Sequence, residues 1–457
     1  MNRESIAGAG ELLSRRSIPL QVLDLAWPVL VEQLLGTAVV LVNTYIVGHL
    51  GASALAAVGL STQLQALLMA LFSAVGVGST ALVARHIGAN QLRKANRVAG
   101  QSFFLSLAVG LLAAVPCILG AEALLRTLGG AEDVVILGRG YLVALGTTMP
   151  LMVVLFIGNA TLRGAGDTRT PMLVMGLVNL VNVVISPSLV YGFGPLPELG
   201  VLGDGIGSAT SVGIGGLVVA VILFRGRSSA GLSITRRAMR FDPRATWQLL
   251  QIGLPSGVEQ FVMRLAQLSL ATVVTQLGTA AYAGHQLGIK LLSIAFLPGF
   301  AFSVAATTLV GQELGRKAPQ RAVACTNTAT WMALGVMCIG GAAVFLLATP
   351  LLRFFTSDAD VIAQGLYAMV GCALIQPSLA WYFVLSGALR GAGDTRFVLL
   401  AQAVPIWLVR LPLASSLGLR FGLGLTGVWV GMIMDVTARA VLLGLRFRGE
   451  AWKHALP

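Results

Sequence analysis

Three carboxylate side chains lie inside long apolar stretches of the sequence, where ionisable groups are rare. They belong to Glu32, Glu259 and Asp435. A charged side chain at the centre of a bilayer costs about 2.5–3.5 kcal/mol on insertion scales, so such residues usually serve a function. A carboxylate buried without a partner holds a proton readily and can carry it across a membrane. The three residues are therefore candidates for binding a coupling ion or a substrate.

Other polar side chains fall on the same stretches. Asn43 follows Glu32 by eleven residues, which places the two within about 20° of each other on a helical wheel. Arg439 follows Asp435 at i,i+4 spacing, so this pair either neutralises itself or forms a cation site. The remaining candidates for contact with a coupling ion or a substrate are Gln33, Gln260, Arg264, His285, Gln286 and Lys290.

Basic side chains outnumber acidic ones within the apolar stretches. The basic ones are Arg139, Arg264, Lys290, Arg410 and Arg439, and against the three carboxylates they leave a balance of +2. Arg410 can line a cavity or extend its guanidinium to the membrane surface. The balance makes a neutral or anionic organic substrate an alternative to a lipophilic cation.

The sequence lacks the common motifs of nucleotide-binding proteins and metalloenzymes. It contains no P-loop and no H-E-x-x-H motif, and its four histidines are widely scattered. A G-x-G-x-x-G match at 422–427 follows no strand and opens an apolar stretch, so it predicts no dinucleotide site. The basic residues form no patch with interleaved aromatic residues, which argues against nucleic acid. We therefore predict no enzyme, no metal site and no cofactor besides a coupling ion, H⁺ or Na⁺.

The elements that must position these residues are helices that cross a lipid bilayer. Hydrophobic residues make up 56% of the 457 residues and charged residues only 11%, whereas soluble domains are about 25% charged. Crossing a bilayer takes about 20 apolar residues. Twelve stretches qualify, at 24–48, 54–82, 98–120, 134–160, 171–192, 205–224, 246–275, 281–309, 324–348, 362–387, 397–417 and 425–446. The predicted fold is an all-α polytopic membrane protein with twelve transmembrane helices.

Lysine and arginine counts set the expected orientation. The N-terminal tail, the even-numbered loops and the C-terminal tail, counted together with Arg446 at the boundary of the last stretch, hold 23 of the 31 basic residues, and the odd-numbered loops hold three. Both termini are therefore expected in the cytoplasm, in agreement with the even number of spans. Residues 1–23 contain no apolar core, so no cleavable signal peptide is expected. The predicted location is the plasma (inner) membrane.

The heptapeptide Arg-Gly-Ala-Gly-Asp-Thr-Arg occurs at 163–169 and again 227 residues later, at 390–396. An identity at half the chain length indicates an internal duplication. Glu32 and Glu259 share the same offset, so in the alternative interpretation they bond Gln or Ser on adjacent helices as a duplicated scaffold contact. Six spans per copy insert both copies in one orientation, as two pseudo-symmetric six-helix bundles. The predicted divisions are a tail (1–23), an N-lobe (24–224), a basic linker (225–245), a C-lobe (246–446) and a tail (447–457).

Each copy of the heptapeptide joins two predicted spans. Its two glycines permit positive φ and a tight turn, and Asp167 or Asp394 can cap the span that follows. Arg163 and Arg390 fall at the level of the cytoplasmic headgroups. The motif is either a turn that positions two helices or a gating contact that one lobe makes when the inward side is closed.

At this motif the chain resembles the MATE (multidrug and toxic compound extrusion) family of secondary transporters. The resemblance covers about residues 20–447. It is carried by both loop copies, extended to 162–171 and 389–396, and by 47–51, 283–286 and 427–429. It implies two six-helix lobes around a central cavity, and export of a compound against an inward flow of H⁺ or Na⁺.

The sequence departs from that family where its acids usually stand. Asn43 and Ser186 occupy positions at which many members carry Asp. Leu379 replaces an acid of the tenth span, and Met263 replaces an acid of the seventh. Coupling would then fall to the three carboxylates named first.

We therefore predict a secondary antiporter that exports small organic compounds in exchange for H⁺ or Na⁺ by rocking of two bundles. A monomer is expected, because one chain completes the cavity. The alternative is a flippase of lipid or lipid-linked saccharide, which an open cavity lined by Arg264, Lys290 and Arg410 would favour. A third class, an intramembrane enzyme or a scaffold, lacks a catalytic constellation in the sequence.

Overall fold

A computed structural model of the chain describes residues 17–193, 197–226, 228, 231–235 and 238–455. Within these ranges the chain is helical and contains no strand, which confirms the predicted all-α fold. The helices form two compact units. Of the described residues, the first unit holds 31–257 and the second combines 17–30 with 258–455, so that α2 (Ile18–Gly48) and α9 (Pro243–Thr275) contribute to both.

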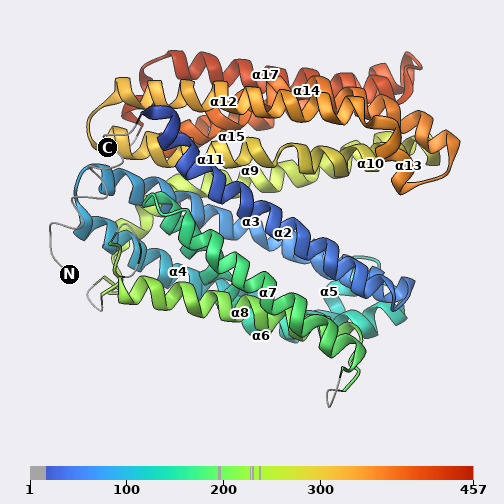
Figure 1. Ribbon diagram of the computed structural model, residues 1–457, viewed down its shortest axis with the longest axis horizontal. Helices are drawn as coiled ribbons and strands as arrows, with labels where there is room; N and C mark the ends of the chain where they lie inside the picture. Colours follow the sequence, from blue (N-terminus) through green and yellow to red (C-terminus); the bar gives the residue numbers. More distant parts are fainter. Residues whose placement is uncertain (1–16, 194–196, 227, 229–230, 236–237, 456–457) are drawn as a thin grey trace. The chain divides into compact units, whose positions relative to one another are not determined.

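The first unit is a bundle built around α6 (Glu132–Gly164), which contacts α3, α4 and α8, while α7 packs on α8 (Figure 1). Close approach depends on small residues, as expected for helices in a membrane. A Cβ added to Gly216 of α8 would lie 2.2 Å from the Leu151 carbonyl oxygen of α6. The other helices of the unit are α3 (Ala52–Gly88), α4 (Leu92–Leu119), α5 (Ala121–Thr127), α7 (Arg169–Tyr191) and α8 (Val201–Arg225).

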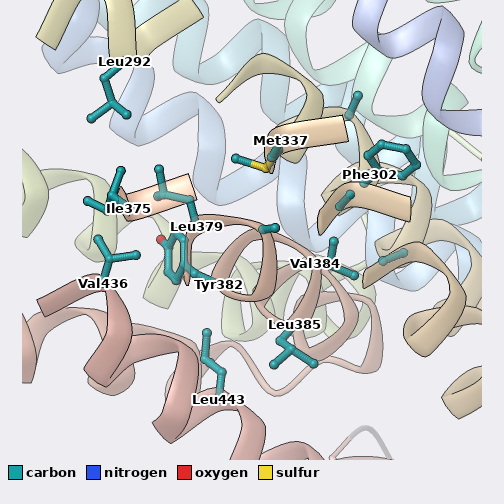
Figure 2. Packing of buried hydrophobic residues seen from close by; sticks show 14 of the residues in the cluster. Leu292, Phe302, Met337, Ile375, Leu379, Tyr382, Val384, Leu385, Val436 and Leu443 are labelled. Atoms are coloured by element: carbon teal, nitrogen blue, oxygen red, sulfur yellow. The ribbon is translucent and has the colours of Figure 1, made fainter. Parts of the chain in front are cut away.

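The second unit is built around α14 (Ala359–Ala392), which contacts α10, α11, α12 and α17. Figure 2 shows Ile375, Leu379 and Leu385 among the buried side chains of this core. The other helices are α10 (Thr279–Ala295), α11 (Leu297–Gly315), α12 (Pro319–Leu346), α13 (Ala348–Phe355), α15 (Thr395–Pro405), α16 (Leu411–Ser415) and α17 (Gly424–Arg448). Two π-helical turns, η1 (Ile406–Arg410) and η2 (Ser416–Arg420), and a 3₁₀ turn, η3 (Ala451–His454), complete it.

Ten helices or helical runs of the described residues are long and apolar enough to cross a membrane, and the bent pair α10–α11 makes an eleventh. Helix α9 coincides with the seventh predicted span and has 33 residues, well above the roughly 20 that a crossing needs. It carries Glu259 and Arg264, which make it more polar than the other helices of membrane length. With α9 added to these ten or eleven spans, the predicted count of twelve is roughly consistent with the structure.

One predicted span is broken. The stretch 281–309 was expected to be a single helix, but the chain bends by 40° between α10 and α11. Pro298 lies at the second position of α11 and cannot donate a hydrogen bond to the preceding turn. The corresponding residue of the first copy is Leu71, and α3 runs there without interruption.

Candidate coupling and binding sites

Glu32 is buried on α2 and is held by the first arginine of the repeated heptapeptide. The Nη2 atom of Arg163 donates a hydrogen bond of 2.7 Å to Glu32 Oε1. The two side chains are only 5% (Glu32) and 13% (Arg163) exposed. The partner is therefore an arginine, where the sequence suggested a lone acid or a contact to Gln or Ser. Two residues that the sequence assigned to separate roles form one ion pair.

The second unit contains the same contact, displaced by 227 residues in sequence. Arg390 Nη2 donates to Glu259 Oε1, and Glu259 is buried. In each pair the second carboxylate oxygen is buried and, within the described part of the chain, has no hydrogen-bond partner. Since an arginine neutralises each glutamate, neither is a free carrier in this conformation.

The heptapeptide forms a tight turn in both copies, as its glycines predicted. Gly166 has φ of 94° and Gly393 has φ of 88°, a region that glycine adopts without steric cost. Asp167 caps α7 as expected, because its Oδ1 accepts a hydrogen bond of 3.0 Å from the Thr170 N–H. Its Oδ2 accepts a second one, of 2.8 Å, from the Thr170 hydroxyl.

Asp394 behaves differently, and its predicted capping role is wrong. Its side chain makes no capping hydrogen bond to α15. Instead its Oδ2 accepts a hydrogen bond of 2.7 Å from Arg446 Nε. The guanidinium of Arg446 also lies 5.0 Å from the ring centre of Phe397. Phe397 stands where the first copy has Thr170, so the capping hydroxyl is absent and Arg446 takes up the carboxylate.

A cluster of polar side chains is buried within the first unit. The Asn182 amide nitrogen lies 3.2 Å from the Ser186 hydroxyl and 3.3 Å from that of Ser208. The amide nitrogen of Asn43 lies 3.3 Å from the same Ser208 hydroxyl. With both amide nitrogens used as donors, the oxygens Asn43 Oδ1 and Asn182 Oδ1 are buried without partners among the described residues.

Asp204 is the acid of this cluster, and no part of its side chain is exposed. It interacts with Tyr141 and Ser186, and Tyr141 in turn interacts with Ser208. Neither carboxylate oxygen accepts a hydrogen bond of ordinary geometry from a described residue. Within the described ranges Asp204 forms no salt bridge, whereas Glu32, Glu259 and Asp435 are each paired with an arginine. An ionised Asp204 would thus be an uncompensated charge.

Glycines of α8 bring Asp204 into place. A Cβ added to Gly205 would lie 2.8 Å from Tyr141 Cα on α6. One added to Gly207 would lie 2.7 Å from Ser186 Cα on α7. These two helices therefore approach α8 on either side of Asp204. The sequence analysis missed this residue because its sixth span began at 205, one residue too late. The i,i+4 spacing of Asp204 and Ser208 among glycines was a signal that could have found it.

The second unit has a different buried cluster, centred on Asp435. Arg439 Nε donates 2.8 Å to Asp435 Oδ1, which confirms the i,i+4 pair. A second cation joins the pair, because Arg410 Nε donates a hydrogen bond of 2.8 Å to Asp435 Oδ2. The three side chains are buried and carry a net charge of +1. Arg410 ends the π-helical turn η1, a distortion that is frequent at functional sites.

The remaining candidates lie on α9 and α10 of the second unit. Gln260, Arg264 and Lys290 are exposed, and polar groups of membrane helices normally face protein or water. Gln286 donates 2.7 Å to the Tyr282 hydroxyl. His285 is buried against Trp429, with ring centres 5.8 Å apart. In the first unit, Gln33 is half-buried on α2.

Comparison with known proteins places this architecture in a family. The MatE family profile matches the chain twice, over residues 28–188 and 255–415. The chain is 31% identical to the probable multidrug resistance protein NorM of Thermotoga maritima, over 95% of this chain and 93% of that protein. It is 26% identical to the uncharacterized transporter YisQ of Bacillus subtilis, over 94% of each.

A solved structure gives the same result for the fold. It is described as the outward-facing conformation of a multidrug resistance MATE family transporter and matches with a TM-score of 0.88 and 25% identity. The match covers 95% of this chain and 96% of that one. Since the family profile covers most of both halves, the chain belongs to the MatE family of multidrug and toxic compound extrusion transporters.

Proposed function

We propose that this protein exports small organic compounds in exchange for an inward-moving cation, H⁺ or Na⁺, which binds at Asp204. Membership of the MatE family and similarity to multidrug resistance proteins support the export of organic compounds. The observation that carries the cation site is a fully buried carboxylate that forms no salt bridge with any described residue.

Burial makes Asp204 a binding group. An isolated ionised carboxylate in a medium of low dielectric constant is highly unfavourable, so it acquires a proton or a counter-ion. Glu32, Glu259 and Asp435 already have arginine partners. Asp204 therefore supplies the carboxylate that the sequence appeared to lack where Asn43 and Ser186 stand.

The neighbours of Asp204 suit either ion. A proton needs only the carboxylate. A sodium ion needs several oxygen ligands. Asn43 Oδ1 and Asn182 Oδ1 are buried oxygens without donors among the described residues, and Asp204 adds its two buried carboxylate oxygens. One coupled charge crossing 100 mV provides about 2.3 kcal/mol, enough for roughly a fifty-fold gradient of substrate. A single site is thus sufficient for useful efflux.

The flippase alternative loses part of its basis. It relied on Arg264, Lys290 and Arg410 lining an open cavity, but Arg410 is buried and bonded to Asp435. Only Arg264 and Lys290 are exposed. Export of a soluble compound is therefore the better supported of the two functions.

The test is transport by purified protein in liposomes, with the Asp204→Asn variant. Asp133→Asn is the matched control, because Asp133 is an exposed carboxylate of the same unit. A cationic dye such as ethidium and an anionic dye such as calcein are supplied, with a pH gradient or a Na⁺ gradient imposed separately. We expect one gradient to drive transport in wild type and in the control, and Asp204→Asn to lower that rate at least ten-fold.

Substrate exchange without any gradient separates coupling from folding. Asp204→Asn should retain this exchange, because the substitution removes the ion site alone. Gradient-driven transport that survives Asp204→Asn would refute the assignment of the site. Transport that neither gradient drives would refute the antiport itself.

A further inference from the structure

A groove with a volume of about 940 Å³ opens on the face of the second unit formed by α12, α14 and α17. Trp331 and Trp381 lie in its apolar wall, with ring centres 6.4 Å apart, and Arg448 and Lys453 also line it. Trp331 is 65% exposed and Leu445 is 61% exposed. Tryptophan is enriched where a membrane protein meets the lipid interface, so this face is one that lipid can reach.

The length of the groove matches one leaflet of a bilayer. Along α17 its lining runs from Thr437 to Arg448, which is eleven steps along the helix or about 16 Å at 1.5 Å per residue. Half of a hydrocarbon core about 30 Å thick is about 15 Å. Arg448 ends this run, and Lys453 follows it in η3. The orientation expected from the sequence places that end at the cytoplasmic headgroups.

The corresponding place in the first unit is covered by the chain itself. By the 227-residue offset, Asn327 of the groove corresponds to Gly100 of α4. A Cβ added to Gly100 would lie 2.3 Å from the carbonyl oxygen of Ala238. The side chain of the neighbouring Gln101 donates 3.1 Å to that same carbonyl. Ala238, which follows α8 in the chain, therefore lies directly on α4.

Apolar side chains complete this cover in the first unit. Ile234 is 3% exposed and packs with Leu155 and Leu223. Phe241 packs on Phe104, with ring centres 5.7 Å apart, and Phe104 corresponds to Trp331. A chain-like apolar occupant thus fits this position of the bundle. In the second unit the equivalent surface is the open groove, and its end carries Arg448 where the first copy has Val221.

We propose that the groove binds one anionic phospholipid of the cytoplasmic leaflet, with an acyl chain against Trp331 and Trp381 and its phosphate at Arg448. Arg448 is exposed and forms no ion pair within the described part of the chain. Lys453 is paired with Glu450, so Arg448 is the main attraction for an anion. The N-terminal tail contains three arginines and two glutamates in residues 1–16, so its side chains carry a net positive charge, which disfavours the tail as an occupant.

The test uses the full-length protein in nonionic detergent, titrated with phosphatidylglycerol or phosphatidylcholine that carries brominated acyl chains. Bromine quenches nearby tryptophan fluorescence. We expect phosphatidylglycerol to quench at roughly five-fold lower mole fraction, the effect of about one basic side chain near an anionic surface. The double variant Trp331→Phe/Trp381→Phe should lose the selective quenching. Arg448→Gln should abolish the preference between lipids and leave quenching by phosphatidylcholine unchanged.

Arg225→Gln is the matched control, because Arg225 is an exposed arginine at the end of α8, the helix equivalent to α17. It should keep the preference. Equal quenching by the two lipids, or the same result for Arg448→Gln and Arg225→Gln, would overturn the proposal. So would stronger quenching after deletion of residues 1–15, because the tail would then be the occupant. None of these measurements depends on transport.

Discussion

Replacing Arg163 with methionine should leave the buried carboxylate of Glu32 without its arginine partner. The burial of this pair determines how much unfolding free energy is lost. Glu32 is 5% exposed and its bond to Arg163 is 2.7 Å long. Breaking a buried pair costs about 3–5 kcal/mol when the remaining charge persists. Protonating an ordinary glutamate instead costs about 3.7 kcal/mol at pH 7, and about 1.4 kcal/mol less for each pH unit below that. The loss of unfolding free energy should therefore approach 3.7 kcal/mol at pH 7 and fall by about 2.7 kcal/mol at pH 5.

Thermal unfolding in detergent, followed by intrinsic tryptophan fluorescence, measures this loss. A unit of this size shifts its Tm by about 2–4 °C per kcal/mol, so Arg163→Met should lower Tm by roughly 7–15 °C at pH 7 and by much less at pH 5. The control is Arg169→Met, which removes an exposed arginine of the same heptapeptide. The double variant Glu32→Gln/Arg163→Met should recover most of the loss. An equal loss at both pH values, or a double variant no more stable than Arg163→Met, would show that the ion pair is not what Arg163 contributes.

Two further contrasts follow from the buried contacts. Asp435→Asn leaves two buried arginines without a carboxylate and should lower the free energy of unfolding by about 3–5 kcal/mol. Arg410→Met leaves the neutral Asp435–Arg439 pair and should change Tm little. Equal losses of stability in the two variants would contradict the argument from charge. Gly164→Ala places a Cβ 2.6 Å from the Thr80 carbonyl oxygen and should destabilise the folded protein by about 1–3 kcal/mol. The Cβ of Gly36→Ala meets nothing within 4 Å, and this substitution should stabilise α2 by up to about 1 kcal/mol. Unfolding in detergent checks this pair too, and a loss in Gly36→Ala would mean that the space beside it is occupied.

The features that sequence analysis predicted correctly depend on local signals. Apolar runs of membrane length identified the helices because their period and composition are visible in a short window. The glycines of the heptapeptide predicted a turn, and Gly166 and Gly393 both adopt positive φ. The break at Pro298 was not predicted, because a proline inside a span does not by itself mark a break: Pro150 and Pro377 lie within continuous helices.

The partners of buried charges could not be predicted in the same way. Arg163 lies 131 residues from Glu32, and Arg410 lies 25 residues from Asp435. No periodicity specifies such pairs, because they depend on which helices pack together. Arg439 was found because its partner is four residues away on the same helix. Asp204 was missed through a boundary error of one residue, and boundaries are where such predictions are least accurate.

The duplication separates what holds each unit together from what distinguishes the two. The glutamate–arginine pairs recur at the same offset, so they serve a need common to both copies, the anchoring of α2 or α9 beside the turn. The residues of the two buried polar clusters do not recur: Asp204 corresponds to Gly431, Ser208 to Asp435 and Val183 to Arg410. The first unit therefore buries an unpaired acid, and the second a cluster of charge +1. Under the function proposed above, the coupling cation binds in the first unit. It follows that Asp204→Asn should remove the ion dependence of transport with little loss of stability, while Asp435→Asn should lower stability and leave the ion dependence of the remaining folded protein intact.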